Sequence, residues 1–239
     1  MSAAPDPSSF DLFQWLPSDV RADFLGAAER RHYGKGQIIY AQGDHGDRMF
    51  RLLSGAVRLS VARADGRELL YLLFEPGDCF GVSSLIDGEG LPQTAEASET
   101  LELLVLRKPD FDRLRATYPE FNDALLRLVS RHMRLLSGLF ADAHLDDITA
   151  RVASRIVAAS SSFGEEAEGG IGLSVGLTQA ELALMVGGSR QTVNRVLRQF
   201  QQEGLVTVRG GRLIILQLAR LRSKTGGGNG LPSRVDSRG

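Results

Sequence analysis

The chain has 239 residues, 43% of them hydrophobic and 24% charged, and its formal net charge at pH 7 is -1. This length suits one large or two modest domains, and the apolar content supports a buried core. The single cysteine, Cys79, excludes an intrachain disulfide framework and an iron–sulfur cluster held by four cysteines of this chain. Because Met1–Ser9 lacks the pattern of a signal peptide and no long apolar run follows, we expect a cytoplasmic protein without a membrane segment.

The N-terminal half is predicted to contain short helices and then strands. Met1–Ser9 is small, polar and proline-containing and is expected to be disordered, whereas Phe10–Arg30 has apolar residues at roughly helical spacing. From Arg31 onward the chain consists of short β-rich runs separated by glycine-containing turns such as Asp65-Gly66. Several short strands at this spacing predict a small barrel or sandwich.

A long helix, predicted from Pro119 to Phe140, carries two apolar stripes. The first has the alternating spacing of three and four residues that is typical of coiled coils, and it consists of Leu126, Val129, Met133, Leu136 and Phe140. The neighbouring stripe consists of Leu125, Leu128, Leu135 and Leu139. Because each stripe needs a partner, we predict that one packs against the chain's own barrel and that the first forms a homodimer interface. Burial of both stripes within one chain is the alternative.

Three further segments are interpreted from their composition. Leu145–Ala159 has the spacing of an amphipathic helix, and Ser160–Gly172 is polar and glycine-rich and is expected to be a loop. Residues 223–239 lack apolar periodicity and are expected to be a disordered tail.

The stretch Leu177–Gly211 has the pattern of a helix, a tight turn, a second helix and a hairpin. Thr178 and Glu181 have the spacing of a capping box at the start of a helix over Gln179–Val186. Gly187-Gly188 is expected to end that helix, since glycine permits the positive φ of a sharp turn.

The second helix is predicted over Arg190–Glu203, with Ser189 as its N-cap. Its apolar residues fall on one side, and its arginine and amide residues fall on the other: Arg190, Gln191, Asn194, Arg195 and Arg198. Such a face suits the major groove of DNA, where Arg can bind guanine through two hydrogen bonds and Gln or Asn can bind adenine. A helical hairpin with an ordinary solvated basic face is the alternative.

A β-hairpin is predicted after this helix, with strands over Leu205–Val208 and Leu213–Leu216. Arg209 and Arg212 at its tip suit phosphate contacts, as in the wing of a winged helix-turn-helix. Seven arginines against two glutamates give residues 178–222 a net charge of +5, so the remainder of the chain is acidic. A basic module on an acidic body localises the attraction for phosphate to one end of the chain.

The order of these parts resembles the CRP/FNR family of transcription regulators. The motifs KGQIIYAQGDHGDRMFRLLSGAVRL and PGDCFG are similar to the family's β-roll, and LTQAELALMVGGSRQTVNRVLRQFQQEGLV is similar to its DNA-binding unit. The resemblance covers about Phe10 to Leu218 and implies an α+β fold. Its parts would be an antiparallel, jelly-roll-like β-roll effector domain over 10–118, a dimerisation helix over 119–143 and a winged helix-turn-helix over 144–222.

The resemblance further implies a bacterial homodimer that binds a near-palindromic double-stranded DNA operator and works with RNA polymerase. Arg190, Gln191 and Arg195 fall on the family's three base-reading positions, and Gln179 and Ser189 fall on phosphate-contacting ones. The middle base-reading residue is often glutamate, so Gln191 predicts a half-site that differs from the family's best-known sequence. Asn194, Arg209 and Arg212 complete the expected DNA-binding set.

The ligand pocket departs from the pattern of cyclic-AMP-binding members. In those members a glutamate for the ribose hydroxyl follows the Phe-Gly of the roll, and an arginine further on binds the cyclic phosphate. Here Val82 stands at the glutamate position and Gln93 at the arginine position. A neutral amide cannot supply the charge-assisted contact that a buried phosphate needs, so we do not expect cyclic AMP to bind in the usual way.

Two interpretations of this pocket stay open. A cyclic nucleotide or another small effector could bind there, lined by Gly81, Val82, Ser83, Ser84, Gln93, Thr94, Leu136 and Ser137. Alternatively the pocket is degenerate, and DNA binding is constitutive or controlled by a protein partner. No metal site is expected, since the four histidines lie in unrelated segments, and no enzyme is expected, since the chain has neither a nucleophile elbow nor a P-loop.

Overall fold

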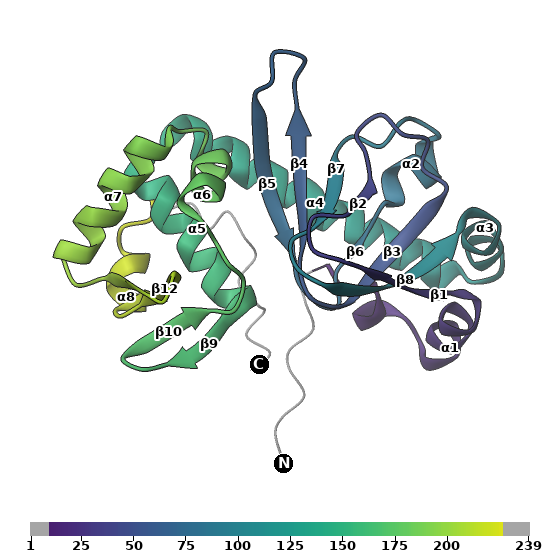
Figure 1. The fold of residues 1–239 in the computed structure, drawn as a ribbon. Helices are drawn as coiled ribbons and strands as arrows, with labels where there is room; N and C mark the ends of the chain where they lie inside the picture. Colours follow the sequence, from purple (N-terminus) through teal and green to yellow (C-terminus); the bar gives the residue numbers. More distant parts are fainter. Residues whose placement is uncertain (1–9, 227–239) are drawn as a thin grey trace. The chain divides into compact units, whose positions relative to one another are not determined.

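The computed structural model of the chain describes residues 10–226 (Figure 1). The chain divides into two compact units. One consists of the residues up to Glu68 together with Leu72–Met133, and the other of Leu69–Tyr71 together with the chain from Arg134 onward. The disorder predicted for Met1–Ser9 and for most of the C-terminal tail concerns residues outside the described range.

The first unit begins with short helices, as predicted for Phe10–Arg30, and continues as strands. The helices are η1 (Leu12–Trp15) and α1 (Ser18–Ala27). The strands are β1 (Glu29–Tyr33), β2 (Ile38–Tyr40), β3 (Arg48–Ser54), β4 (Val57–Ala62), β5 (Glu68–Phe74), β6 (Cys79–Phe80), β7 (Thr94–Ala97) and β8 (Leu101–Arg107). They form two four-stranded sheets with the orders β1-β8-β3-β6 and β2-β7-β4-β5. The pairings of β1, β2, β3, β4, β6, β7 and β8 are antiparallel, so the predicted β-roll is confirmed.

Burial along the strands explains why these segments form a roll. In β5, Leu70, Leu72 and Phe74 are buried and alternate with more exposed residues, as expected when one face of a sheet covers a core. Strand β8 lies between β1 and β3 and is buried along most of its length. Gly81 follows β6 with a φ of +78°, and a Cβ there would lie 2.8 Å from the carbonyl oxygen of Arg48. The glycine that ends the PGDCFG motif is therefore required by both the backbone angle and the packing.

Three elements of this unit are not predicted by the sequence. Strand β1 pairs with β8 at the edge of its sheet, but its residues are mostly exposed, so it lacks an apolar alternation. Helix α2 (Val82–Asp87) is short, and β7 carries two alanines where larger apolar residues would mark a strand. Short or polar elements give a weak periodic signal, which explains the omissions.

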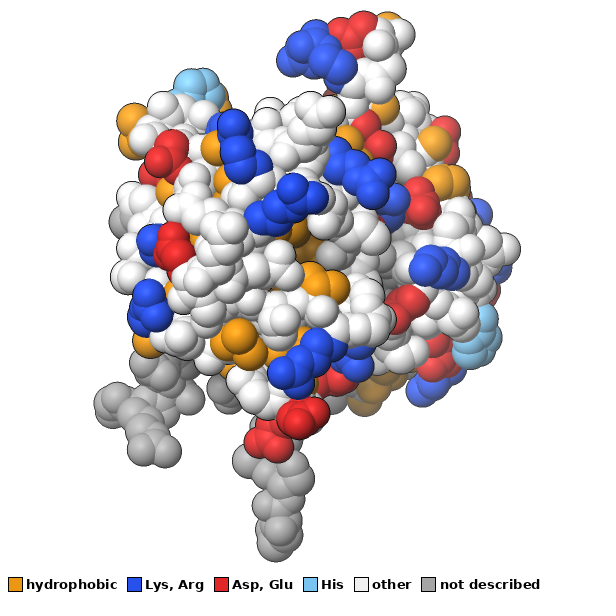
Figure 2. All heavy atoms as spheres, turned by 60° about the vertical axis from the view of Figure 1, so that its left-hand side comes forward, with side chains coloured by type: hydrophobic (Ala, Val, Ile, Leu, Met, Phe, Trp, Pro, Cys, Tyr) orange, Lys and Arg blue, Asp and Glu red, His pale blue; other side chains and the backbone are white. Residues whose placement is uncertain are grey.

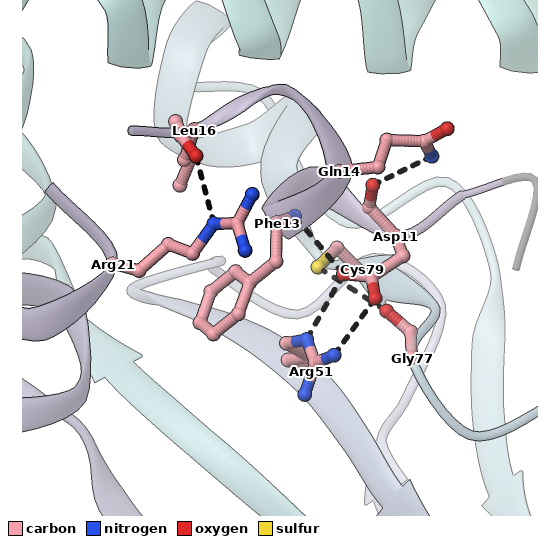
Figure 3. A network of polar contacts seen from close by, with 8 residues as sticks. All are labelled: Asp11, Phe13, Gln14, Leu16, Arg21, Arg51, Gly77 and Cys79. Atoms are coloured by element: carbon pink, nitrogen blue, oxygen red, sulfur yellow. Dashed lines mark hydrogen bonds and ion pairs between the residues drawn. The ribbon is translucent and has the colours of Figure 1, made fainter. Parts of the chain in front are cut away.

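A buried ion pair ties the N-terminal segment to the roll (Figure 3). Arg51 of β3 donates from Nε and Nη2 to the two carboxylate oxygens of Asp11, over 3.1 and 2.8 Å. The guanidinium also lies 4.2 Å from the centre of the Phe13 ring. Burial alone would lower the pKa of Arg51, but the hydrogen bond and the charge of Asp11 raise it, so the arginine stays charged. Cys79 lies beside this pair and is fully buried, and burial raises the pKa of its thiol.

Helix α3 (Lys108–Thr117) leads into α4 (Pro119–Leu145), which continues past the predicted end at Phe140. In the predicted inner stripe, Leu125, Leu128 and Leu135 are buried, with at most 3% of each residue exposed, and Leu139 is half-buried. The other stripe is exposed, by between 39% and 68% at each position: Leu126, Val129, Met133, Leu136 and Phe140. One chain therefore covers only one of the two stripes, and the alternative in which both are buried within it is wrong.

The second unit contains the C-terminal helices and a four-stranded sheet. Its elements are α5 (Ile148–Phe163), β9 (Gly164–Ala167), β10 (Gly170–Leu173), α6 (Gln179–Val186), α7 (Arg190–Gln202), β11 (Val206–Arg209), β12 (Arg212–Ile215) and α8 (Leu218–Arg222). The sheet order is β11-β12-β10-β9, so the predicted wing hairpin is extended by a second hairpin. Helices and sheet share one hydrophobic core, which includes Val152, Ile156, Leu182, Val193 and Phe200.

The loop predicted over Ser160–Gly172 is wrong. Helix α5 extends into this segment, and β9 and β10 then form an antiparallel hairpin around a turn at Glu168 and Gly169. Gly169 has a φ of +87°, and a Cβ at Gly170 would collide with the carbonyl of Ile215 in β12. The glycines therefore permit a tight turn and a close approach of strands rather than a flexible connection.

His132 of α4 packs among aromatic residues of the first unit. Its ring stacks on Phe10, with the ring centres 4.5 Å apart and the planes 15° apart, and lies 6.1 Å from the ring of Phe74. Its Nε2 atom is buried, and no group in the described part of the chain forms a hydrogen bond with it. Burial lowers the pKa of His132 to about 4, so this residue is a neutral packing element.

We expect the free energy of unfolding to decrease as the pH falls from about 6.5 to about 4. Well above pH 6.5 the imidazole is neutral in both states, whereas below it the unfolded chain takes up a proton that folded His132 does not bind until about pH 4. The full effect corresponds to about 3 kcal/mol. Urea unfolding at several pH values should show a shallower pH dependence of the free energy of unfolding for His132→Phe than for the wild type. Identical pH dependence of wild type and His132→Phe would contradict this prediction.

Candidate nucleic-acid interface

Helix α6 begins at the capping box that the sequence predicts. The N–H of Glu181 donates to Oγ1 of Thr178 over 3.1 Å, and the N–H of Thr178 donates to the Glu181 carboxylate over 2.8 Å. The helix ends at Gly187, whose φ of +65° is in the left-handed region that favours glycine. Leu182 and Val186 are buried, so α6 is fixed to the core by its apolar face.

Helix α7 separates an apolar face from a polar face, as predicted. Ser189 caps it, because the N–H of Thr192 donates to its Oγ over 3.1 Å. The buried face consists of Val193, Val196, Leu197 and Phe200. The opposite face, together with Gln179 of α6, lines a shallow depression: Arg190, Gln191, Asn194, Arg195, Arg198, Gln199 and Gln202. Every side chain of this lining is basic or an amide, so the surface is rich in hydrogen-bond donors and positive charge.

Two of the expected DNA-binding residues bind each other. Nδ2 of Asn194 donates to Oε1 of Gln179 over 2.8 Å and joins α7 to the first turn of α6. This bond occupies the acceptor of the Gln179 amide and leaves its Nε2 donors for a group outside the pair. A phosphate oxygen is such an acceptor, so Gln179 fits a phosphate contact and Asn194 supports it. Sequence spacing alone does not predict this pairing.

The wing arginines bind carboxylates of the same chain. Nη2 of Arg212 lies 3.1 Å from Oε2 of Glu165, and Nη1 of Arg209 lies 3.5 Å from Oε2 of Glu168. Both glutamates belong to the β9–β10 hairpin, for which the sequence predicts a loop. Figure 2, in which the side of the C-terminal unit comes forward, shows Lys and Arg side chains spread over this face and carboxylates next to some of them at its lower edge. The acidic run Glu165-Glu166-Ala167-Glu168 was the available signal for these neighbours.

The first part of the candidate effector pocket lies at helix α2. Gly81 is its N-cap, Val82 and Ser84 are buried, and Ser83 is exposed. Oγ of Ser84 is buried without a hydrogen-bond partner among the described residues. At Val82, where the family resemblance leads to the expectation of a glutamate for the ribose hydroxyl, the apolar side chain offers no hydrogen bond to a sugar hydroxyl.

The remaining candidates lie elsewhere in the chain. Gln93 precedes β7 and Thr94 begins it, and both are half-buried. Oγ1 of Thr94 accepts a hydrogen bond from the N–H of Gln42 over 3.0 Å, which leaves its own hydroxyl proton for another group. Leu136 and Ser137 are exposed on α4. None of these eight candidate side chains is charged.

Within residues 10–226, no group of three or more His, Cys, Asp or Glu side chains is placed to hold a metal ion. The helices of the same range include none that is both long and apolar enough to cross a membrane.

Comparison with known proteins gives matches over most of the chain. The cyclic nucleotide-binding domain family matches residues 30–118, and the Crp-like helix-turn-helix domain family matches residues 150–224. The chain is 33% identical over 213 residues to the CRP-like cAMP-activated global transcriptional regulator of Mycobacterium tuberculosis (strain CDC 1551 / Oshkosh), covering 88% of this chain and 94% of the relative. It is also 33% identical over 210 residues to the cyclic AMP receptor protein of Thermus thermophilus, with the same coverage of 88% and 94%.

A solved structure agrees with these relatives. A transcriptional regulator of the CRP family from Thermus thermophilus superposes with a TM-score of 0.71 at 27% identity, covering 83% of this chain and 97% of that one. Fold and site thus define a winged helix-turn-helix protein joined to a cyclic-nucleotide-binding-type β-roll. With one third identity to curated relatives over most of its length, the chain belongs to the CRP/FNR family of transcription regulators.

Substitution of Arg190, which the sequence predicts to read a base, tests the register of α7. We expect Arg190→Ala to weaken binding to the preferred DNA site by about 1–3 kcal/mol and to relax base preference at one position, since a bidentate contact to guanine is lost. Arg222→Ala removes the same charge from an exposed position of α8 and should leave base preference unchanged. The affinities of both protein variants are measured for a panel of single-base variants of the DNA site at one salt concentration. If base preference is unchanged at every position in Arg190→Ala, Arg190 does not read a base and the expected register of α7 is wrong.

Proposed function

We propose that the protein is a homodimeric, sequence-specific regulator that binds a near-palindromic double-stranded DNA operator. The outward face of α7 carries this proposal, since Arg190, Gln191 and Arg195 are exposed there and line a surface of basic and amide groups only. These are the side chains that read base edges in the major groove. In this proposal residues 10–118 sense a signal, 119–143 dimerise and 144–222 bind DNA, while Ser189, whose Oγ caps α7, lies at the helix end that faces the phosphates. RNA polymerase is the proposed further partner, and no enzymatic activity is proposed.

The exposed stripe of α4 supports the dimer. Its side chains recur at the alternating spacing of a coiled coil, and the chain itself leaves them uncovered. The same stripe on a second copy is self-complementary about a two-fold axis, which gives an isologous interface. A two-fold dimer presents two copies of α7, which matches two half-sites about 34 Å apart along DNA.

The dimer is tested by placing a charge in the stripe. Met133 is 65% exposed in the single chain, so Met133→Glu should not disturb folding, but it would bury two carboxylates at the proposed interface. We expect the dimer dissociation constant to increase by about 100-fold or more. Leu25→Glu changes another exposed apolar residue, which lies on α1 and is 49% exposed, and this variant should remain dimeric. Sedimentation equilibrium distinguishes the outcomes, and a dimeric Met133→Glu would exclude this stripe as the interface.

The effector is proposed to be bound without the usual charged contacts. The relatives from M. tuberculosis and T. thermophilus are named for cyclic AMP, which makes a cyclic nucleotide the first class of ligand to test. In this chain, however, Val82 and Gln93 replace the charged ligands, so a cyclic phosphate would be held only by neutral groups such as Ser83 and Thr94. Control would act by a population shift, in which the effector prefers the dimer state whose recognition helices match the operator.

A constitutive or partner-controlled regulator is the second candidate function. The absence of any charged side chain among the eight candidate pocket residues favours it. In this case the roll would set the dimer geometry or bind another protein.

Selection from random DNA tests the function and its control together. Full-length protein should enrich a near-palindromic site at fixed salt, and failure to enrich any sequence would refute the proposed function. Binding to that site is then measured without ligand and with cyclic AMP, cyclic GMP or cyclic di-GMP. A change with one nucleotide identifies the effector class, whereas tight binding that none of them alters favours the constitutive or partner-controlled regulator.

A further inference from the structure

Each wing arginine is held by the β9–β10 hairpin through more than one contact. Nη2 of Arg212 binds the Glu165 carboxylate over 3.1 Å, while its Nε donates to the carbonyl oxygen of Leu173 over 3.1 Å. Nη1 of Arg209 donates to the carbonyl oxygen of Glu168 over 3.3 Å and lies 3.5 Å from the carboxylate of the same residue. These are the guanidinium groups that the wing would offer to DNA.

We propose that Glu165 and Glu168 compete with DNA phosphate for Arg209 and Arg212, so that the wing contributes less than its two positive charges to DNA binding. The proposal rests on the DNA-binding function proposed above. A phosphate that approaches a paired arginine must either displace the carboxylate or lie within a few ångströms of it. In the second case the two negative charges repel each other. Both routes reduce the free energy gained from the contact.

The carboxylates stay beside the wing because one sheet holds both hairpins. Strand β10 pairs with β12 at Ile171↔Ile215 and Gly172↔Ile214, and β12 is itself a strand of the wing. The close approach at Gly170, where a Cβ would collide with Ile215, leaves little freedom between the hairpins. The acidic hairpin therefore accompanies the wing when the wing approaches DNA.

The ion pairs have little to do with folding stability. The side chains of Arg209 and Arg212 are 55% and 53% exposed, and those of Glu168 and Glu165 are 95% and 60% exposed. Pairs with this exposure contribute little to the free energy of unfolding. Replacing the carboxylates should therefore leave the melting temperature unchanged. The replacement should instead change the affinity for polyanions such as DNA.

Glu166 provides a matched control on the same strand. Side chains alternate between the two faces of a strand, so Glu166 points to the face opposite Glu165. Glu166→Gln and Glu165→Gln remove the same charge from adjacent positions. A merely global effect of net charge would make them equal, whereas competition for the wing arginines makes Glu165→Gln the stronger change.

The experiment measures DNA affinity of the full-length protein against salt concentration. We expect Glu165→Gln/Glu168→Gln to bind the selected site and unrelated duplex DNA about 3- to 10-fold more tightly at about 0.1 M salt. The slope of log affinity against log salt should steepen, by up to about 0.9 for each arginine that gains a full phosphate contact. Glu166→Gln should change the affinity by less than about twofold.

Two further measurements make the outcome decisive. In an Arg209→Ala/Arg212→Ala background the gain from the double glutamine variant should fall to the level of Glu166→Gln. The salt concentration of elution from heparin gives the same ranking of variants with a polyanion that contains no operator. If the wild type selects no DNA sequence, the proposed function fails, but the heparin ranking still decides the competition. Equal effects of Glu165→Gln and Glu166→Gln, or a gain that persists without the two arginines, would overturn it.

Discussion

Helix α4 is apolar on two faces, and the chain covers only one of them. Leu125, Leu128 and Leu135 are buried, which fixes the rotation of the helix and thereby leaves the stripe through Leu126 and Met133 on the outside. A contiguous exposed row of large apolar side chains is unusual in a monomer and marks an interaction surface. In the proposed dimer a second copy would cover the stripe with the same residues from both sides, and its two-fold symmetry would extend to the two copies of α7 and to the operator.

Much of the DNA-binding unit could be predicted from the sequence because local rules determine it. The capping box of Thr178 and Glu181, the left-handed glycine at 187 and the Ser189 cap each depend on residues within one turn of one another. Helical periodicity likewise determines which face of α7 is buried and which is exposed. The exposure of Arg190, Gln191 and Arg195 was therefore predictable before any tertiary contact was known.

Features that depend on contacts between distant segments could not be predicted in this way. The β9–β10 hairpin has almost no apolar alternation of its own and becomes part of a sheet only because β10 pairs with β12. Strand β1 is likewise polar, and only its pairing with β8 makes it a strand. The bond between Asn194 and Gln179 and the pairing of Arg212 with Glu165 also join residues on different elements, so their spacing along the chain does not indicate either contact.

Contacts between distant segments also alter the effective charge of the DNA-binding unit. Counted along residues 178–222 the unit is strongly basic, but the glutamates that neutralise its wing come from β9 and the turn beside it, outside that count. Phosphate contacts hold a protein on any duplex, whereas base contacts distinguish one sequence from another. A wing with weakened phosphate contacts makes overall affinity depend more on α7, and therefore on both copies of α7 fitting their half-sites together. In the proposed dimer, a small change in the spacing of the two helices would then alter DNA binding more than it would with a strongly basic wing.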